Sequence, residues 1–127
     1  MSPKKVQLIK LLRPKDWAKN FFLFLPVFFS GEFLDTEKVL RLAIGFFAFS
    51  FVASSIYIIN DYRDIEDDQK HPVKHTRPLA SGAVSKPLAI IICSLLLIAG
   101  FTIAWFLRDK FLFVLAIYFL INLGYSF

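Results

Sequence analysis

Four long apolar runs, separated by short polar segments, dominate this chain of 127 residues. The runs cover residues 17–34, 39–59, 88–107 and 111–127, and only Arg41 interrupts the second of them with a charge. An α-helix needs about 20 apolar residues to cross the hydrocarbon core of a bilayer. The pattern therefore predicts an all-α protein, a polytopic transmembrane helical bundle of which four spans are present here.

A basic, amphipathic segment precedes the first run. Residues 1–16 interleave leucine, isoleucine and valine with lysine and arginine, which predicts a short helix lying on the membrane surface. Pro14 is predicted to end or kink this helix, because proline cannot donate a backbone hydrogen bond. A secretory signal peptide is the competing interpretation of a basic stretch before an apolar one. No small-residue cleavage site follows, and further spans do, so the membrane-surface helix is preferred.

Composition and charge support residence in a membrane. Hydrophobic residues make up 57% of the chain, and sixteen residues are phenylalanine, which is unusual for a soluble domain. The single cysteine, Cys93, excludes a disulfide framework and a cysteine-based metal site. The net charge of +5 is therefore interpreted in terms of membrane orientation and anionic lipid, and no nucleic-acid partner is expected.

Lysine and arginine are distributed unevenly between the polar segments. They are dense in residues 1–19 and in the loop 60–87, and sparse in the two segments that join the other runs. The cytoplasmic loops of membrane proteins carry the excess of positive charge. The N-terminus and the 60–87 loop are therefore predicted to be cytoplasmic, on the side where diphosphate metabolites are found.

This loop begins with a dense cluster of carboxylates. Five of the ten acidic residues lie in the segment 60–68, directly after an apolar run. On a helix that continues the run, Asp61, Asp64 and Asp68 share one face, whereas Glu66 lies on the opposite face. Carboxylates repel one another unless a cation holds them, and Mg²⁺ prefers oxygen ligands. The cluster indicates a magnesium site, and a solvated acidic loop is the alternative that the spacing leaves open.

Basic residues follow the carboxylates. They are Lys70, His71, Lys74, His75 and Arg77. A magnesium–diphosphate site requires both groups, because the carboxylates hold the metal and the cations meet the phosphate oxygens that the metal leaves free. The planar fork of Arg77 suits phosphate, and the proline after it favours an extended backbone. An ordinary inside-positive loop is the alternative. Pro72 lies between the two histidines and argues against a helical zinc pair.

Two stretches of the loop together form a long and specific pattern. The residues read NDxxDxxxD at 60–68 and HPxKxxRPLASG at 71–82. This pattern resembles the first aspartate-rich motif of the UbiA superfamily of intramembrane prenyltransferases. The stretch LRPKDWAKNFFLFLPVFFSG at 12–31 narrows the resemblance to the decaprenyl-phosphate phosphoribosyltransferase branch. The resemblance covers essentially all of residues 1–127 as a single membrane domain, but only the N-terminal part of such a protein.

The resemblance implies a nine-helix bundle around a central cavity, in which two aspartate-rich motifs bind Mg²⁺ and diphosphate. By this resemblance, catalytic and metal-binding roles are assigned to Asp61, Asp64 and Asp68. Substrate-binding roles are assigned in the same way to Lys19, Asn20, Asn60, Lys74 and Arg77. A lysine that snorkels to the lipid headgroups explains Lys19 equally well.

The implied activity is that of a Mg²⁺-dependent transferase of the bacterial plasma membrane. It would move 5-phosphoribose from phosphoribosyl diphosphate to a polyprenyl phosphate such as decaprenyl phosphate, so its partners are a diphosphate donor, a lipid-phosphate acceptor and the bilayer. The alternatives are a prenyltransferase that uses an allylic diphosphate and an aromatic acceptor, and a small non-enzymatic membrane scaffold. The second aspartate-rich motif is not in this sequence. The chain is therefore interpreted as a fragment that is inactive alone, with a complete four-helix protein as the alternative.

Overall fold

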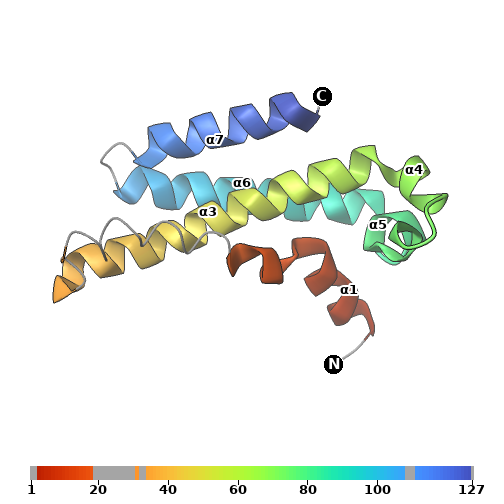
Figure 1. The fold of residues 1–127 in the computed structure, drawn as a ribbon, viewed down its shortest axis with the longest axis horizontal. Coiled ribbons are helices and arrows are strands. Elements are labelled where there is room, and N and C mark those ends of the chain that lie inside the picture. The colour runs from red at the N-terminus through yellow and green to blue at the C-terminus, as the bar shows by residue number, and fades with distance from the viewer. Residues whose placement is uncertain (1–2, 19–30, 32–33, 108–110, 127) are drawn as a thin grey trace.

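The chain folds into helices that pack lengthwise against one another (Figure 1). The computed structural model describes residues 3–18, 31, 34–107 and 111–126, and these residues contain no β-strand. The prediction of an all-α protein is confirmed.

Within the described residues, two helices are long and apolar enough to cross a membrane. They are α3 (Thr36–Arg63) and α6 (Lys86–Leu107), which match the predicted runs 39–59 and 88–107. The fourth run forms a shorter apolar helix, α7 (Phe111–Ser126). The first predicted span lies mostly outside the described residues.

The longest helix, α3, carries the acidic motif at its C-terminal end. Asp35 caps its N-terminus by accepting a hydrogen bond from the backbone N–H of Lys38 (3.3 Å). The helix continues past the apolar run to Arg63, where the backbone of Asp64 (φ −94°, ψ 12°) interrupts it. Helix α4 (Ile65–Gln69) follows. The continuous helix predicted over the motif is therefore two helices, and aspartate, a poor helix former, lies at the break.

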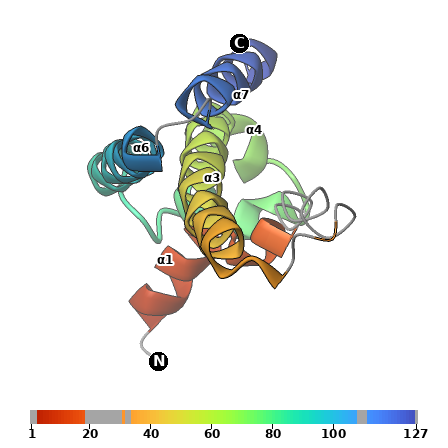
Figure 2. The same cartoon turned by 90° about the vertical axis from the view of Figure 1, so that its left-hand side faces the viewer.

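Helix α6 lies beside α3 in both views (Figures 1 and 2), and a glycine allows the close approach. A Cβ atom at Gly100 would lie 2.7 Å from Cγ2 of Val52 and 3.1 Å from the carbonyl oxygen of Ala48. Small residues allow membrane helices to pack at short range in this way. Helix α7 completes this core through Leu115, which is fully buried and packs in one cluster with Val52 and Ala104.

The N-terminal helix α1 (Pro3–Leu12) ends where the proline signal predicts. Arg13 follows in the left-handed backbone region (φ 53°), which is uncommon for a residue other than glycine, and Pro14 comes next. Leu11 is fully buried in a core shared with Ile58 and Leu79, so one face of α1 packs on the protein. The predicted membrane-surface helix is therefore tied to the helical bundle along that face.

Two hydrogen bonds hold the segment after α1 against α3. Nε1 of Trp17 donates to Oγ of Ser54 (2.8 Å), and that hydroxyl donates to the carbonyl oxygen of Leu12 (2.6 Å). Ser54 is fully buried in α3, so its polar group needs these partners. The contacts fix the position of Arg13, which lies between Leu12 and Trp17 in the sequence.

The segment between α4 and α6 folds back onto the end of α3. It contains a 3₁₀ turn, η3 (Lys74–Thr76), and the short helix α5 (Pro78–Ser81). Gly82 ends α5 in the left-handed conformation (φ 80°), which glycine adopts without steric cost. Leu79 is buried in the core under α3, so the residue just before α5, Arg77, lies beside the carboxylates.

Candidate active site

Arg77 connects two carboxylates of the aspartate-rich motif. Its Nη1 lies 3.4 Å from Oδ1 of Asp61 and 3.3 Å from Oδ2 of Asp68. The two aspartates are 2% and 4% exposed, and buried carboxylates need a charged or hydrogen-bonding partner. Asp61 and Asp68 therefore lie on one side of the motif, as their seven-residue spacing requires, and Arg77 bridges them.

A second arginine reaches the same site from the N-terminal segment. Nη2 of Arg13 donates to Oδ1 of Asp61 at 2.5 Å, so this one oxygen accepts hydrogen bonds from two arginines. The guanidinium of Arg13 also lies over the ring of Tyr57, with Cζ 4.9 Å from the ring centroid. Asp61 is therefore the point at which α3, the N-terminal segment and the segment after α4 meet.

Asp64 occupies a more open position in the same motif. It pairs with the neighbouring Arg63 (3.4 Å), and its side chain is 36% exposed. Glu66 and Asp67 are exposed, and Glu66 is on the side away from the bridge, as the helical-face prediction requires. Asp64 lines a small pocket together with Asp61, so both carboxylates are accessible from one space.

This space, the carboxylate pocket, has a volume of about 300 Å³. Its lining residues are Arg13, Asn60, Asp61, Arg63, Asp64, Arg77 and Asn122. Asn122 comes from α7, which returns its C-terminal end toward the acidic end of α3 (Figure 1). The segment after α1, the C-terminal end of α3, the residue before α5 and α7 thus contribute to one polar pocket.

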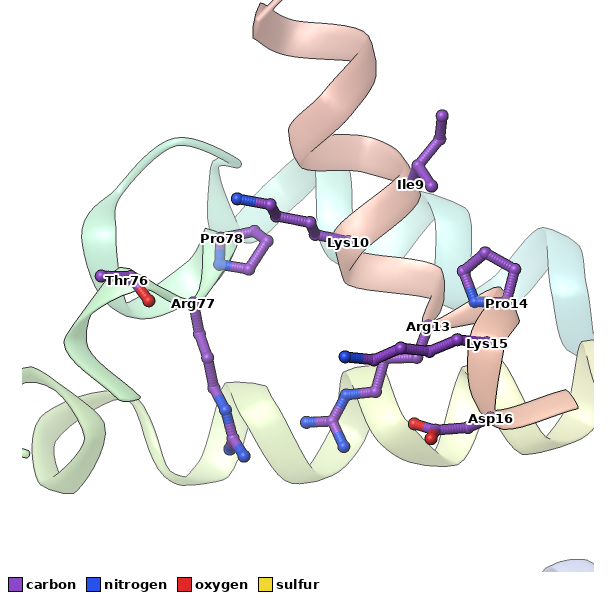
Figure 3. Close-up of a pocket in the computed structure, with 9 residues that line it drawn as sticks. All are labelled: Ile9, Lys10, Arg13, Pro14, Lys15, Asp16, Thr76, Arg77 and Pro78. Carbon is purple, nitrogen blue, oxygen red and sulfur yellow. The ribbon is translucent and has the colours of Figure 1, made fainter. Parts of the chain in front are cut away.

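A larger space, the basic cavity, lies between α1 and the segment before α5 (Figure 3). Its volume is about 590 Å³, within the range of about 300–1,000 Å³ that is usual for small-molecule sites. Four cations line it: Lys10, Arg13, Lys15 and Arg77. Asp16 is the one acidic residue among the described residues of the lining. Because Arg13 and Arg77 line both spaces, the basic cavity and the carboxylate pocket adjoin each other.

The chemistry of the carboxylate pocket fits a hard divalent cation. Asp61 and Asp64 line it with carboxylate oxygens, which are the ligands that Mg²⁺ prefers, and Asp68, which is not in the lining, is joined to Asp61 through Arg77. Among the described residues, however, no three histidine, cysteine, aspartate or glutamate side chains lie close enough together to hold a metal ion. Arginines occupy the positions next to Asp61 and Asp68 instead. The motif thus supplies suitable ligands for a metal, and the guanidinium groups of two arginines lie beside two of these ligands, Asp61 and Asp68.

The structure places the remaining predicted residues as follows. Asn60 lines the carboxylate pocket, as expected for part of the motif. Lys74 is exposed on the 3₁₀ turn and lines neither the carboxylate pocket nor the basic cavity. Lys19 and Asn20 lie outside the described residues.

The sequence pattern did not identify two contributors to the site. The sequence assigns Arg13 to an amphipathic helix and to the 12–31 stretch without a role in the site, and it assigns Asn122 only to an apolar run. A signal exists for each residue. A proline directly after an arginine marks a helix end, and a lone amide in an apolar helix is usually functional. Neither signal predicts contact with Asp61, because that depends on how distant segments pack.

Comparison with known proteins supports the resemblance carried by the motif. The model of the UbiA prenyltransferase family matches residues 21–127. Over 94% of its length, the chain is 38% identical to the decaprenyl-phosphate phosphoribosyltransferase of Mycolicibacterium smegmatis and 34% identical to that of Mycobacterium tuberculosis. A nodulation protein, NoeC, of Azorhizobium caulinodans is 39% identical over 69% of the chain and 28% of its own length.

The chain spans about two fifths of the two phosphoribosyltransferases, covering 39% and 41% of their lengths. The family model nevertheless matches most of this chain, including the aspartate-rich motif, Arg77 and Asn122. Apolar helices and a carboxylate pocket beside them are what a helical membrane transferase requires. The chain belongs to the UbiA prenyltransferase family.

Proposed function

We propose that this chain is part of a Mg²⁺-dependent membrane transferase that moves 5-phosphoribose from phosphoribosyl diphosphate to a polyprenyl phosphate such as decaprenyl phosphate. The observation that carries this proposal is the bridge of Arg77 between Asp61 and Asp68, which brings carboxylates and a cation into one pocket. Relatives at 33–38% identity are named decaprenyl-phosphate phosphoribosyltransferase, which favours phosphoribose as the transferred group.

The reaction would break the bond between C1 of the ribose and the diphosphate oxygen. An oxygen of the polyprenyl phosphate would form the new bond to C1, and diphosphate would leave with the bonding electron pair. Arg77 and Arg13 would donate hydrogen bonds to the phosphate oxygens, where negative charge increases in the transition state. Asp61, Asp64 and Asp68 would hold Mg²⁺, which neutralises charge on a leaving diphosphate.

Transfer of a prenyl group from an allylic diphosphate to an aromatic acceptor is the second candidate. The match to a family of prenyltransferases favours it. Both reactions have the same leaving group, so the carboxylate pocket serves either of them. The two candidate reactions therefore differ in the donor that is used and not in the metal site.

We infer further that residues 1–127 alone are inactive. This inference is supported by the share of the relatives that the chain covers, about two fifths. Purified 127-residue protein that transferred phosphoribose would contradict it. All activity tests below therefore use the full-length protein.

We also propose that the carboxylate pocket opens to the cytoplasm of a bacterial cell, because the N-terminal segment and the 60–87 loop carry the excess of lysine and arginine. In a Cys93→Ser background, a cysteine at position 70 should react with a membrane-impermeant reagent in inverted vesicles but not in intact cells. Residue 70 is exposed, so the reagent can reach it. Labelling in intact cells would reverse the proposed orientation.

The proposed activity should depend on a divalent cation. With membranes that contain the full-length protein, polyprenyl phosphate and labelled phosphoribosyl diphosphate, label should enter the organic phase. EDTA should stop the transfer, and Mg²⁺ should restore it, because the carboxylates and the diphosphate repel each other without a cation. Label transfer that is unaffected by EDTA would rule out the metal site. The absence of label transfer with Mg²⁺ would rule out the proposed donor.

A further inference from the structure

The basic cavity contains more positive charge than the carboxylate pocket needs. Of the four described cations that line the basic cavity, Arg13 and Arg77 contact aspartates of the motif, whereas Lys10 and Lys15 do not. Within the described part of the chain, no ion pair joins either lysine to an acidic residue. Asp16 is the one carboxylate among the described lining residues, so the four cations leave an excess of positive charge that is suited to an anionic ligand.

The arrangement of the side chains limits the type of anion. In Figure 3, Lys10, Arg13 and Lys15 extend from the N-terminal segment into the gap, and Thr76 and Arg77 face them from the opposite side. Four cationic side chains that carry hydrogen-bond donors thus surround one space, whereas the hydroxyl of Thr76 donates to the carbonyl oxygen of Val73 (2.9 Å). A phosphate monoester carries two negative charges near neutral pH and three strong acceptor oxygens, so it can use several of these donors at once.

We propose that the basic cavity is a binding site for a phosphate monoester that is not coordinated to metal. This assignment rests on the function proposed above and extends it to a second phosphate site beside the carboxylate pocket. Arg13 and Arg77 line both spaces, so the two phosphate groups would share a wall of guanidinium groups. Two substrates of the proposed reaction carry such a group: the donor has a 5-phosphate on its ribose, and the acceptor is itself a lipid phosphate.

The test uses a double variant, Lys10→Gln with Lys15→Gln, in the full-length protein reconstituted in phosphatidylcholine nanodiscs. Both lysines are exposed and neither contacts an aspartate, so the fold and the arginine bridge should persist. Equilibrium binding of labelled ribose 5-phosphate and of labelled farnesyl phosphate is measured without Mg²⁺. We expect the affinity for at least one of the two probes to fall by about tenfold or more, because charge-assisted hydrogen bonds are lost. Lys5→Gln, on the same helix, is the matched control and should bind normally.

The two probes distinguish the two sources. A loss confined to ribose 5-phosphate assigns the cavity to the donor, and a loss confined to farnesyl phosphate assigns it to the acceptor. A loss for both assigns it to any phosphate monoester. Replacement of both lysines by arginine should restore binding in each case.

Unchanged affinity for both probes in the folded double variant would overturn the proposal. It would also be overturned if neither ribose 5-phosphate nor farnesyl phosphate bound saturably to the unmodified protein. The binding measurement requires no turnover. Failure of the full-length protein to transfer phosphoribose would therefore overturn the proposed function, while the role of the cavity would still be decided.

Discussion

Replacement of Asp64 by asparagine is expected to lower phosphoribosyl transfer by the full-length protein on the order of 10³-fold while leaving the protein folded. Asp64 lines the carboxylate pocket with Asp61, but its side chain is 36% exposed and pairs only with its neighbour Arg63 among the ion pairs of the described residues. The substitution preserves size and removes one negative charge. The proposed metal site therefore loses a ligand, whereas no buried arginine loses its partner.

Glu66→Gln is the matched control for Asp64→Asn. Glu66 is exposed, belongs to the same motif and lies on the face away from Arg77, so its loss should change transfer less than about twofold, as for most surface substitutions. Initial rates at several Mg²⁺ concentrations would show whether the Asp64 variant also needs more metal. Equal losses of activity at positions 64 and 66 would show that the acidic residues act only through their summed charge.

Replacement of Arg77 by alanine is expected to reduce both transfer and stability. Two buried carboxylates, Asp61 and Asp68, lose a donor, and Asp68 has no other ion-pair partner among the described residues. We expect the free energy of unfolding to fall by about 2 kcal/mol, which is the usual contribution of a hydrogen bond to a charged group. Transfer should fall on the order of 10²-fold, because Arg77 also donates to the phosphate oxygens.

A second substitution separates these two effects. Adding Asp68→Asn to Arg77→Ala removes the uncompensated charge, so the thermal unfolding midpoint should recover. Because Asp68 is itself a proposed metal ligand, transfer is compared with that of Asp68→Asn alone, and the double variant should stay below it. Lys86→Ala, an exposed cation at the start of α6, is the control and should change neither quantity. If transfer recovered together with stability in the double variant, the role of Arg77 would be limited to holding the fold.

The sequence predicted those features of the site that depend on local periodicity. Asp61 and Asp68 are seven residues apart, and this spacing alone places them on one side of a helix. The break at Asp64 did not follow from the apolar pattern, which ends at residue 59 and carries no information about helix continuity beyond it. The apolar runs predicted α3 and α6 because a spanning helix needs little more than length and hydrophobicity.

The contacts of the two arginines could not be predicted in the same way. Arg77 reaches the carboxylates only because Leu79 is buried and Gly82 turns the chain back toward α6. Arg13 reaches Asp61 because Leu11 packs into the core and the backbone at Arg13 is left-handed. Both contacts join segments far apart in sequence, and side-chain packing, which a one-dimensional pattern does not contain, decides them.

The measurement that tests the proposed function most directly is a choice between donors. Membranes that contain the full-length protein receive Mg²⁺, a polyprenyl phosphate, an aromatic acid, and two donors with different labels, phosphoribosyl diphosphate and an allylic diphosphate. We expect the phosphoribosyl label to enter the organic phase as a lipid-linked product, and the Asp64→Asn variant to lower this transfer on the order of 10³-fold. If the phosphoribosyl label stays in the aqueous phase while the aromatic acid gains the prenyl label, the phosphoribosyl assignment is wrong. The full-length protein would then transfer a prenyl group to an aromatic acceptor.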